Sequence, residues 1–351
     1  MMDLSTLVFL SSGLFLGWSL GANDAANIFG TAVGTKMVKF RTAAVICSIF
    51  VVLGAVISGA GTSRTLEDLG EVNALAGAFM VALSSALAIY IVLQYKVTVS
   101  TSQAIVGAII GWNLYCGKQT DYSVLGKIVS TWILCPILSA VFAIALYCIL
   151  KKFLKKAQIH LIRQDSYTRI GLILTGALGA YALGANNMAN VVGVFINDNP
   201  FSDISSRFAD ITAEQVLFFI GALSVCVGVF TYSQKVMMTV GNSLMRMSPA
   251  VALVVVLSNA LVLLLFSSQN LSNWLLAHNL PSVPLVPVSS TQAVIGAIIG
   301  IGLFKGGRGI HWNILAKIGI GWVAAPVLAM VICFICLFFL ENVFNQTVYL
   351  P

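Results

Sequence analysis

The sequence contains little charge and little histidine. Only 9% of its 351 residues are Asp, Glu, Lys or Arg and only three are histidine, whereas 59% are hydrophobic. Soluble domains carry about a quarter charged residues, so this composition excludes a soluble globular protein. The mean hydropathy is +0.96 and apolar runs of about 20 residues recur from end to end, which indicates an integral membrane protein.

The residue types that commonly build metal centres and enzyme active sites are scattered along the chain. The three histidines have no metal-ligand spacing, and the seven cysteines lie mostly inside apolar runs, where packing is their expected role. No nucleophile–base pair is visible. We therefore expect no enzyme activity and no cofactor. Because the basic residues lie in short loops between apolar runs, we also expect no nucleic-acid partner.

The apolar runs predict an all-α polytopic membrane protein of two halves. Five segments form a first repeat at 1–150, a basic cytoplasmic linker follows at 151–169, and five segments form a second repeat at 170–351. We expect some segments to be broken or re-entrant helices. The segments lie at 4–34, 42–61, 72–94, 97–115, 128–150, 170–196, 215–232, 249–268, 284–304 and 312–340.

Two polar motifs occur once in each half. Gly21-Ala-Asn-Asp-Ala-Ala-Asn27 returns as Gly184-Ala-Asn-Asn-Met-Ala-Asn190, and residues 100–111 match residues 289–300 at eight of twelve positions. The first pair is offset by 163 residues and the second by 189, so the second half has 26 more residues between its motifs. We expect much of this insertion at 197–214. Three single residues repeat as well, at a constant offset of 190: Lys127, Trp132 and Pro136 match Lys317, Trp322 and Pro326.

The basic residues predict how the two halves are oriented. With the N-terminus outside and ten single crossings, fourteen lysines and arginines fall in inner loops and four outside, a clear positive-inside bias. Five crossings per repeat make the second repeat inverted, an architecture typical of secondary transporters, with both termini outside. The inner residues are Lys36, Lys39, Arg41, Lys96, Lys151, Lys152, Lys155, Lys156, Arg163, Arg169, Lys235, Arg246, Lys305 and Arg308; the outer ones are Arg64, Lys118, Lys127 and Arg207.

Asp24 is the one carboxylate placed well inside a predicted span, and an intramembrane acid is a functional-site hypothesis because burying it is costly. A structural carboxylate that caps a broken helix is the alternative. Hard cations bind carboxylate, amide and carbonyl oxygens, and the flanking glycines predict unwound helices that expose carbonyls. The candidate cation ligands are Asn23, Asp24, Asn27, Gln103, Asn186, Asn187, Asn190 and Gln292.

Hydroxyl clusters stand where two apolar helices are predicted to begin. A helix N-terminus offers free N–H groups and partial positive charge, and hydroxyls add donors, so these clusters suit an oxyanion. Ordinary N-caps are the alternative. No arginine occurs at the motifs, and charge balance therefore favours a co-bound cation and symport. The candidate anion ligands are Ser100, Thr101, Ser102, Ser289, Ser290 and Thr291.

These motifs resemble the inorganic phosphate transporter (PiT) family, on GANDAAN at 21–27, GANNMAN at 184–190 and the STSQ and SSTQ segments. The resemblance implies phosphate uptake driven by a sodium or proton gradient, through an inverted-repeat bundle in the plasma (inner) membrane, commonly as a homodimer. Sodium is expected at Asn23, Asp24, Asn186, Asn187, Gln103 and Gln292, as a co-substrate. The family often has aspartate in both motifs, whereas this chain has Asn187, so its two cation positions need not be equivalent.

Three other functions stay open at this point. Hydroxyl and amide donors suit sulfate as well as phosphate, and coupling to protons is an alternative to sodium. A membrane receptor or scaffold would use the same polar clusters only to lock helices together. An intramembrane enzyme is the third, and the lack of a nucleophile–base pair argues against it.

Overall fold

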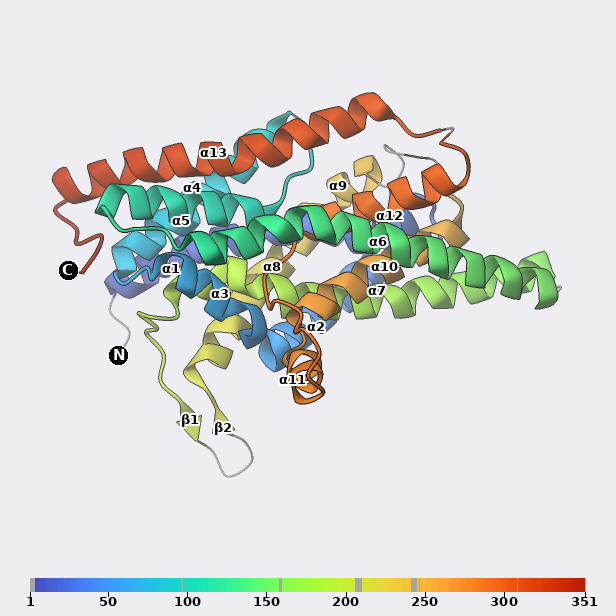
Figure 1. Cartoon of the computed structure of the whole chain (residues 1–351), viewed down its shortest axis with the longest axis horizontal. Helices are drawn as coiled ribbons and strands as arrows, with labels where there is room; N and C mark the ends of the chain where they lie inside the picture. The colour runs from blue at the N-terminus through green and yellow to red at the C-terminus, as the bar shows by residue number, and fades with distance from the viewer. Residues whose placement is uncertain are drawn as a thin grey trace.

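The computed structural model describes residues 4–95, 97–157, 160–205, 210–240, 245, 247–307 and 309–350; Lys96, Arg207, Arg246 and Arg308 of the orientation argument lie outside them. The described chain forms a bundle of helices aligned along one axis (Figure 1). Eight of the helices in these ranges are long and apolar enough to cross a membrane, which confirms the predicted all-α membrane protein. They are α1 (Leu4–Gly34), α2 (Phe40–Ser58), α4 (Leu75–Gln94), α6 (Tyr122–Ala157), α7 (Leu161–Val192), α8 (Ala213–Thr231), α10 (Pro249–Ser267) and α13 (Trp312–Asn342).

The other two predicted segments are shorter helices that begin inside the protein. α5 (Thr101–Cys116) has 16 residues and α12 (Ser290–Phe304) has 15, too few to cross about 30 Å of hydrocarbon as straight helices. Their N-caps, Ser100 and Ser289, are 1% and 2% exposed. Each helix follows a non-helical stretch, 97–100 or 280–289, that enters the bundle. These are the re-entrant elements that the sequence predicts.

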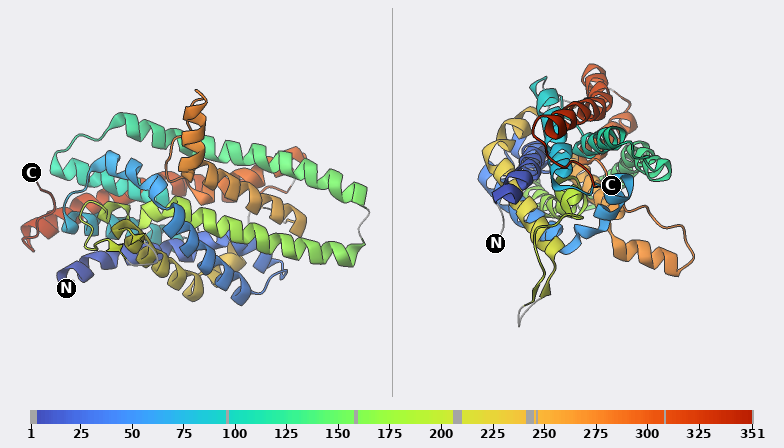
Figure 2. Two further views of the ribbon diagram at one scale, coloured as in Figure 1. Left: turned by 90° about the horizontal axis from the view of Figure 1, so that it is seen from below. Right: turned by 90° about the vertical axis from the view of Figure 1, so that its left-hand side faces the viewer.

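Several short elements were not predicted. The extra residues of the second half lie in two places: 193–212, which contains an antiparallel pair that matches Ile204 with Ile211, and 268–289. The prediction of 197–214 covers only the first. Both insertions project from the side of the bundle (Figures 1 and 2). The short elements are α3 (Ala60–Gly70), a 3-10 turn (Gly193–Phe195), β1 (Ile204–Ser205), β2 (Asp210–Ile211), α9 (Ser233–Val240) and α11 (Gln269–Ala277).

Helix packing follows the repeat in a crossed pattern. α5 packs on α13 and its counterpart α12 packs on α6, while α1 packs on α8 and its counterpart α7 packs on α2. At the crossings, a Cβ on Gly107 would overlap the carbonyl of Pro326, and a Cβ on Gly296 would overlap the carbonyl of Pro136. Equivalent residues thus meet equivalent partners from the other half, as expected of two interlocked inverted repeats.

The predicted linker at 151–169 is mostly helical. α6 continues to Ala157 and α7 begins at Leu161, so only three residues separate the two long helices in the sequence. They extend together past the rest of the bundle, at the end opposite to both chain termini (Figure 1).

The prediction of unwound helices at the first motif pair is wrong. α1 and α7 run without interruption through 21–27 and 184–190, so backbone carbonyls there stay in the helical hydrogen-bond ladder. The glycines serve close packing instead. A Cβ on Gly21 would overlap the carbonyl of Val225, and one on Gly184 would overlap that of Val51. The motif therefore offers side-chain atoms, and not freed carbonyls, to its surroundings.

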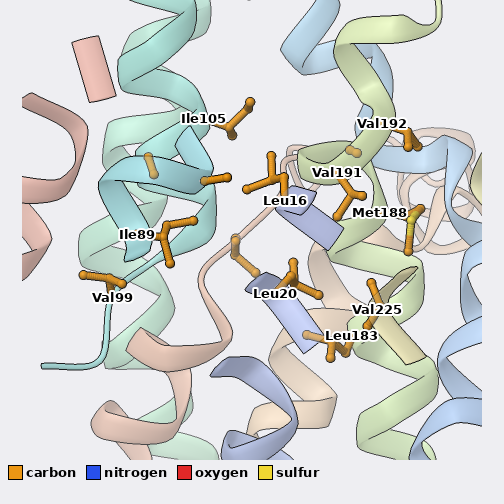
Figure 3. Packing of buried hydrophobic residues seen from close by; sticks show 14 of the residues in the cluster. Leu16, Leu20, Ile89, Val99, Ile105, Leu183, Met188, Val191, Val192 and Val225 are labelled. Atoms are coloured by element: carbon orange, nitrogen blue, oxygen red, sulfur yellow. The ribbon is translucent and has the colours of Figure 1, made fainter. Parts of the chain in front are cut away.

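Apolar side chains on the N-terminal side of the motif hold α1 between the two halves. Leu16 and Leu20 are fully buried and lie between Ile89 and Ile105 on one side and α7 residues such as Leu183 on the other (Figure 3). Burying a leucine side chain stabilises a fold in water by about 1.5–3 kcal/mol. Inside a bilayer the same contacts contribute mainly through close packing, which holds the motif at a fixed height.

Candidate functional site

Asp24 lies at the centre of a cluster of amide donors. Its carboxylate is 2% exposed. Oδ1 accepts hydrogen bonds from Nδ2 of Asn23 at 2.7 Å and from Nδ2 of Asn27 at 3.3 Å, and Oδ2 accepts one from Nδ2 of Asn187 at 3.3 Å. These neutral donors offset part of the cost of burying a carboxylate, and none of them carries a positive charge.

The polar end of α1 continues into the N-terminus of α12. Nδ2 of Asn27 also lies 3.0 Å from Oγ of Ser290 and 3.1 Å from Oγ1 of Thr291. The second repeat makes the matching contact, because Nδ2 of Asn190 in α7 donates to Oγ of Ser102 in α5 at 2.8 Å. The last asparagine of each motif, Asn27 or Asn190, is thus bonded to the hydroxyl cluster of the opposite half.

A hydroxyl of each cluster also bonds to the backbone directly before the other cluster. Oγ of Ser102 donates to the carbonyl of Val288 at 3.3 Å, and Oγ1 of Thr291 donates to the carbonyl of Val99 at 3.2 Å. Val99 and Val288 each directly precede an N-cap. The N-termini of α5 and α12 therefore face each other, with the same two contacts made in both directions.

The capping alternative is correct for one hydroxyl in each cluster. Oγ of Ser100 accepts the N–H of Gln103, and Oγ of Ser289 accepts the N–H of Gln292, both at 3.2 Å. Ser102 and Thr291 lie inside the first turn and bond across the site instead. The structure therefore separates structural caps from hydroxyls that face the other repeat.

Several side-chain oxygens in the cluster are buried without a hydrogen-bond partner, although buried polar atoms are nearly always paired. Amide oxygens accept but cannot donate, so their remaining ligands must be N–H or O–H donors or cations. The set consists of amides, hydroxyls and one carboxylate, which suits a hard cation such as sodium. The unpaired atoms are Asn23 Oδ1, Thr101 Oγ1, Gln103 Oε1, Asn187 Oδ1, Asn190 Oδ1 and Gln292 Oε1.

Asn186 differs from its counterpart Asn23. Its Nδ2 lies 3.3 Å from the carbonyl of Leu263 and 3.4 Å from that of Val286, and its Oδ1 accepts the N–H of Val288 at 2.9 Å. Both ends of the amide thus hold the non-helical stretch that leads into α12. Oδ1 of Asn23, by contrast, has no partner. Of the two, only Asn23 thus keeps its amide oxygen free for a further ligand, whereas Asn186 positions the chain.

All fourteen side chains named from the sequence are between 0% and 6% exposed, so the site is closed to both ends of the bundle. Within the described ranges, no three His, Cys, Asp or Glu side chains lie close enough to hold a metal ion. Sequence reasoning missed Asn259 in α10, which is fully buried with neither amide atom hydrogen-bonded. The signal that could have found it was an amide in the middle of the apolar run 249–268.

Comparisons with known proteins cover nearly the whole chain. A family model described as the phosphate transporter family matches residues 20–272 and 274–350. A protein of Methanocaldococcus jannaschii with a phosphate permease name is 29% identical, over 95% of this chain and 97% of its own. A Bacillus subtilis protein named "Probable low-affinity inorganic phosphate transporter" is 25% identical, over 97% of this chain and 98% of its own. A solved structure described as "The sodium-dependent phosphate transporter" has the same fold, with a TM-score of 0.74 at 21% identity, covering 95% of this chain and 99% of that one.

Proposed function

This chain belongs to the phosphate transporter family, and on that premise we propose that it imports inorganic phosphate by symport with sodium. Transport, and not catalysis, is the family's activity. Two observations favour sodium: the solved structure with the same fold is that of a sodium-dependent transporter, and the site is rich in oxygen and free of histidine. Coupling to protons would need only one titratable group to carry the proton. The cluster instead contains many neutral oxygens, which are ligands for a metal cation.

The observation that carries the proposal is the meeting of two buried helix N-termini beside one buried carboxylate. Phosphate would lie between α5 and α12, bound by their free N–H groups and by the hydroxyls of Ser102 and Thr291. These hydroxyls would exchange their carbonyl partners for phosphate oxygens, and the net change in hydrogen-bond free energy would be small. Thr101 and Ser290 add donors at the same turn, and the capping serines Ser100 and Ser289 hold the turns in shape. The six expected anion ligands therefore differ in role: four of them donate to phosphate, and the two capping serines only maintain the helix turns.

Charge balance explains why cations must accompany the anion. Two helix N-termini contribute roughly one positive charge together. Phosphate brings one or two negative charges and Asp24 brings another, so roughly one to two monovalent cations are needed for neutrality. The unpaired oxygens of Asn23, Gln103, Asn187 and Gln292 are the natural ligands for them, with Asp24 supplying the charge.

Asn27 and Asn190 connect the two kinds of site. Each donates to a hydroxyl of the opposite helix N-terminus, and Asn27 also donates to Asp24. A sodium ion that draws Asp24 or its amides closer would therefore reorient the hydroxyls that bind phosphate. We expect this linkage to make the affinity for each substrate depend on the other.

The proposal is tested by radiolabelled phosphate uptake into proteoliposomes. We expect uptake with an inward sodium gradient, none with an inward proton gradient in sodium-free buffer, and no competition from excess sulfate. Protein-free vesicles and the Asp24→Asn variant are the controls. Uptake driven by protons alone would replace sodium in the proposal, competition by sulfate would broaden the substrate, and no uptake under either gradient would refute it.

We also expect a homodimer, as the resemblance implies, and both termini outside, as the basic residues of the loops predict. The two chain ends lie at the same end of the bundle (Figure 1), which agrees with a common side for both. Cross-linking in vesicles and protease access to tagged termini measure these two properties.

A further inference from the structure

A cleft of about 710 Å³ lies far from the phosphate site, where α6 and α7 approach their connection and meet the first turn of α10. Leu150 and Leu154 of α6 and Leu253 of α10 form an apolar side. Arg163, Gln164 and Tyr167 from the start of α7 form a polar side. Its volume is in the range of small-molecule sites. A ligand that fills it must have an apolar part and an anionic or hydrogen-bonding part.

We propose that this cleft binds the headgroup region of an anionic phospholipid. Basic pockets between membrane helices on the cytoplasmic side are known binding places for acidic headgroups. The phosphate of such a lipid would pair with the guanidinium of Arg163, and its glycerol and upper acyl carbons would lie along Leu150, Leu154 and Leu253. This ligand is distinct from the transported anion.

The charges around the cleft fit an acidic ligand. Lys151, Lys152, Lys155 and Lys156 are all exposed on the same stretch of α6, and they raise the positive potential around the cleft. The acid of this region, Asp165, is paired with Arg169 at 3.5 Å, which reduces its repulsion toward an anion. His160 also lines the cleft.

Aromatic side chains place the cleft at the level of the headgroups. Phe153 and Tyr167 line it and are 61% and 58% exposed, and such exposed aromatic residues are typical of membrane–water interfaces. At the same end of α6, Nζ of Lys305 lies 4.7 Å from the ring of Tyr147, another interfacial pairing. Because the positive-inside pattern assigns this end to the cytoplasm, the ligand belongs to the inner leaflet.

The apolar side favours a lipid over free phosphate. The cleft is lined by one arginine and by several leucines. A small, fully hydrated anion such as free phosphate would contact the arginine but would gain nothing from the leucines. A phospholipid gains from both sides of the cleft. Its binding would join the end of the first repeat to the second, because α6 and α10 both line the cleft.

The test is native mass spectrometry of the full chain, purified in detergent and titrated with phosphatidylglycerol or with phosphatidylcholine of the same acyl chains. We expect one phosphatidylglycerol to be retained with an affinity at least about tenfold above that of phosphatidylcholine, since a charge-assisted bond is worth about that factor. Arg163→Gln removes the charge and Ala250→Phe fills the cleft without changing charge; each should reduce the affinity roughly tenfold. Arg41→Gln removes an exposed charge from another predicted inner loop and should change nothing.

Equal retention of the two lipids would overturn the proposal, as would unchanged phosphatidylglycerol binding in both cleft variants. Displacement of phosphatidylglycerol by millimolar inorganic phosphate would instead identify a free-anion site and also reject a lipid site. Sodium-driven phosphate uptake by Arg163→Gln serves as the folding control, because Arg163 is exposed and remote from the transport site.

Discussion

Nδ2 of Asn187 lies 3.3 Å from Oδ2 of Asp24, and the two residues occupy the same position in the two copies of the repeated motif. The hydrogen bond therefore crosses the pseudo-twofold relation between α1 and α7. An acid in one copy of the motif faces an amide at the equivalent position of the other copy. One carboxyl group, and not two, is therefore buried at the centre of the bundle.

Replacing this acid tests its role in coupling. Asp24→Asn removes the charge and keeps the shape, so we expect sodium-driven phosphate uptake to fall roughly tenfold or more, as for loss of a charge-assisted interaction. The protein should still fold, because an amide can bond to its asparagine neighbours. Asp68→Asn, which removes an exposed acid of α3, is the control. Wild-type sodium dependence in Asp24→Asn would show that another group binds the cation.

Introducing a second acid beside Asp24 should make the stability of the protein depend on bound cations. Asn187→Asp places two carboxylates within hydrogen-bond distance at a buried site, where like charges repel. We expect a lower melting temperature in choline buffer and a larger stabilisation by added sodium than in the wild type. Intrinsic fluorescence during heating measures both. Equal sodium responses in the two proteins would mean that no cation binds between these positions.

The hydroxyls should divide into ligands and caps. Ser102→Ala and Thr291→Ala each remove a donor that faces the other repeat, so we expect the KM for phosphate to rise about two- to tenfold, the value of one hydrogen bond. Ser100→Ala and Ser289→Ala remove N-caps and should cost about 1 kcal/mol of stability with a smaller change in KM. A uniform effect of all four on KM would contradict this division.

The glycine contacts between helices should not tolerate a methyl group. Gly107→Ala and Gly296→Ala drive a Cβ into the carbonyls of Pro326 and Pro136, and we expect each to destabilise the protein by about 1–3 kcal/mol. Gly126→Ala in α6 is a matched control, because a Cβ there meets nothing within 4 Å. It should be neutral or stabilising by up to about 1 kcal/mol through helix propensity. Thermal unfolding in detergent separates the three variants.

We expect Asn259 to lower the stability of the protein while contributing to transport. A fully buried amide without partners costs about 1–3 kcal/mol, so Asn259→Leu should raise the melting temperature in sodium-free buffer. If the amide serves the transported ions, sodium-driven uptake should fall severalfold in the same variant. Ser258→Ala is the control, because that hydroxyl already bonds to the carbonyl of Val254 at 2.7 Å. Unchanged uptake would limit Asn259 to packing.

Much of this architecture could be predicted from the sequence because its signals are long or repeated. The apolar run at 4–34 predicts α1 at its observed bounds, and two motif copies at unequal offsets predict a duplicated unit with an insertion. The bonds of Asn27 and Asn190 then join residues that the sequence had only grouped by type. Membrane spans are predictable in this way because each is fixed by local apolarity.

The failures come from tertiary packing, which leaves no local signal. Glycine beside asparagine is compatible with an unwound helix, but Gly21 instead allows the carbonyl of Val225 to approach α1, a tertiary contact that the sequence does not reveal. The short helix α3 is too polar overall to stand out as an apolar run, and α11 begins directly after the span α10. Likewise, the division between Ser100 as a cap and Ser102 as a cross-site donor depends on which atoms each meets.

The matched contacts between the repeats bear on the direction of transport. The bonds Ser102–Val288 and Thr291–Val99 are equivalent in the two repeats, so in the proposed transport cycle they would favour neither an outward-open nor an inward-open state. A difference between those two states must come from the departures from symmetry, namely Asp24 opposite Asn187 and the two insertions of the second half. In the proposed symport, transport would therefore run in either direction, and the ion gradients across the membrane would set which one.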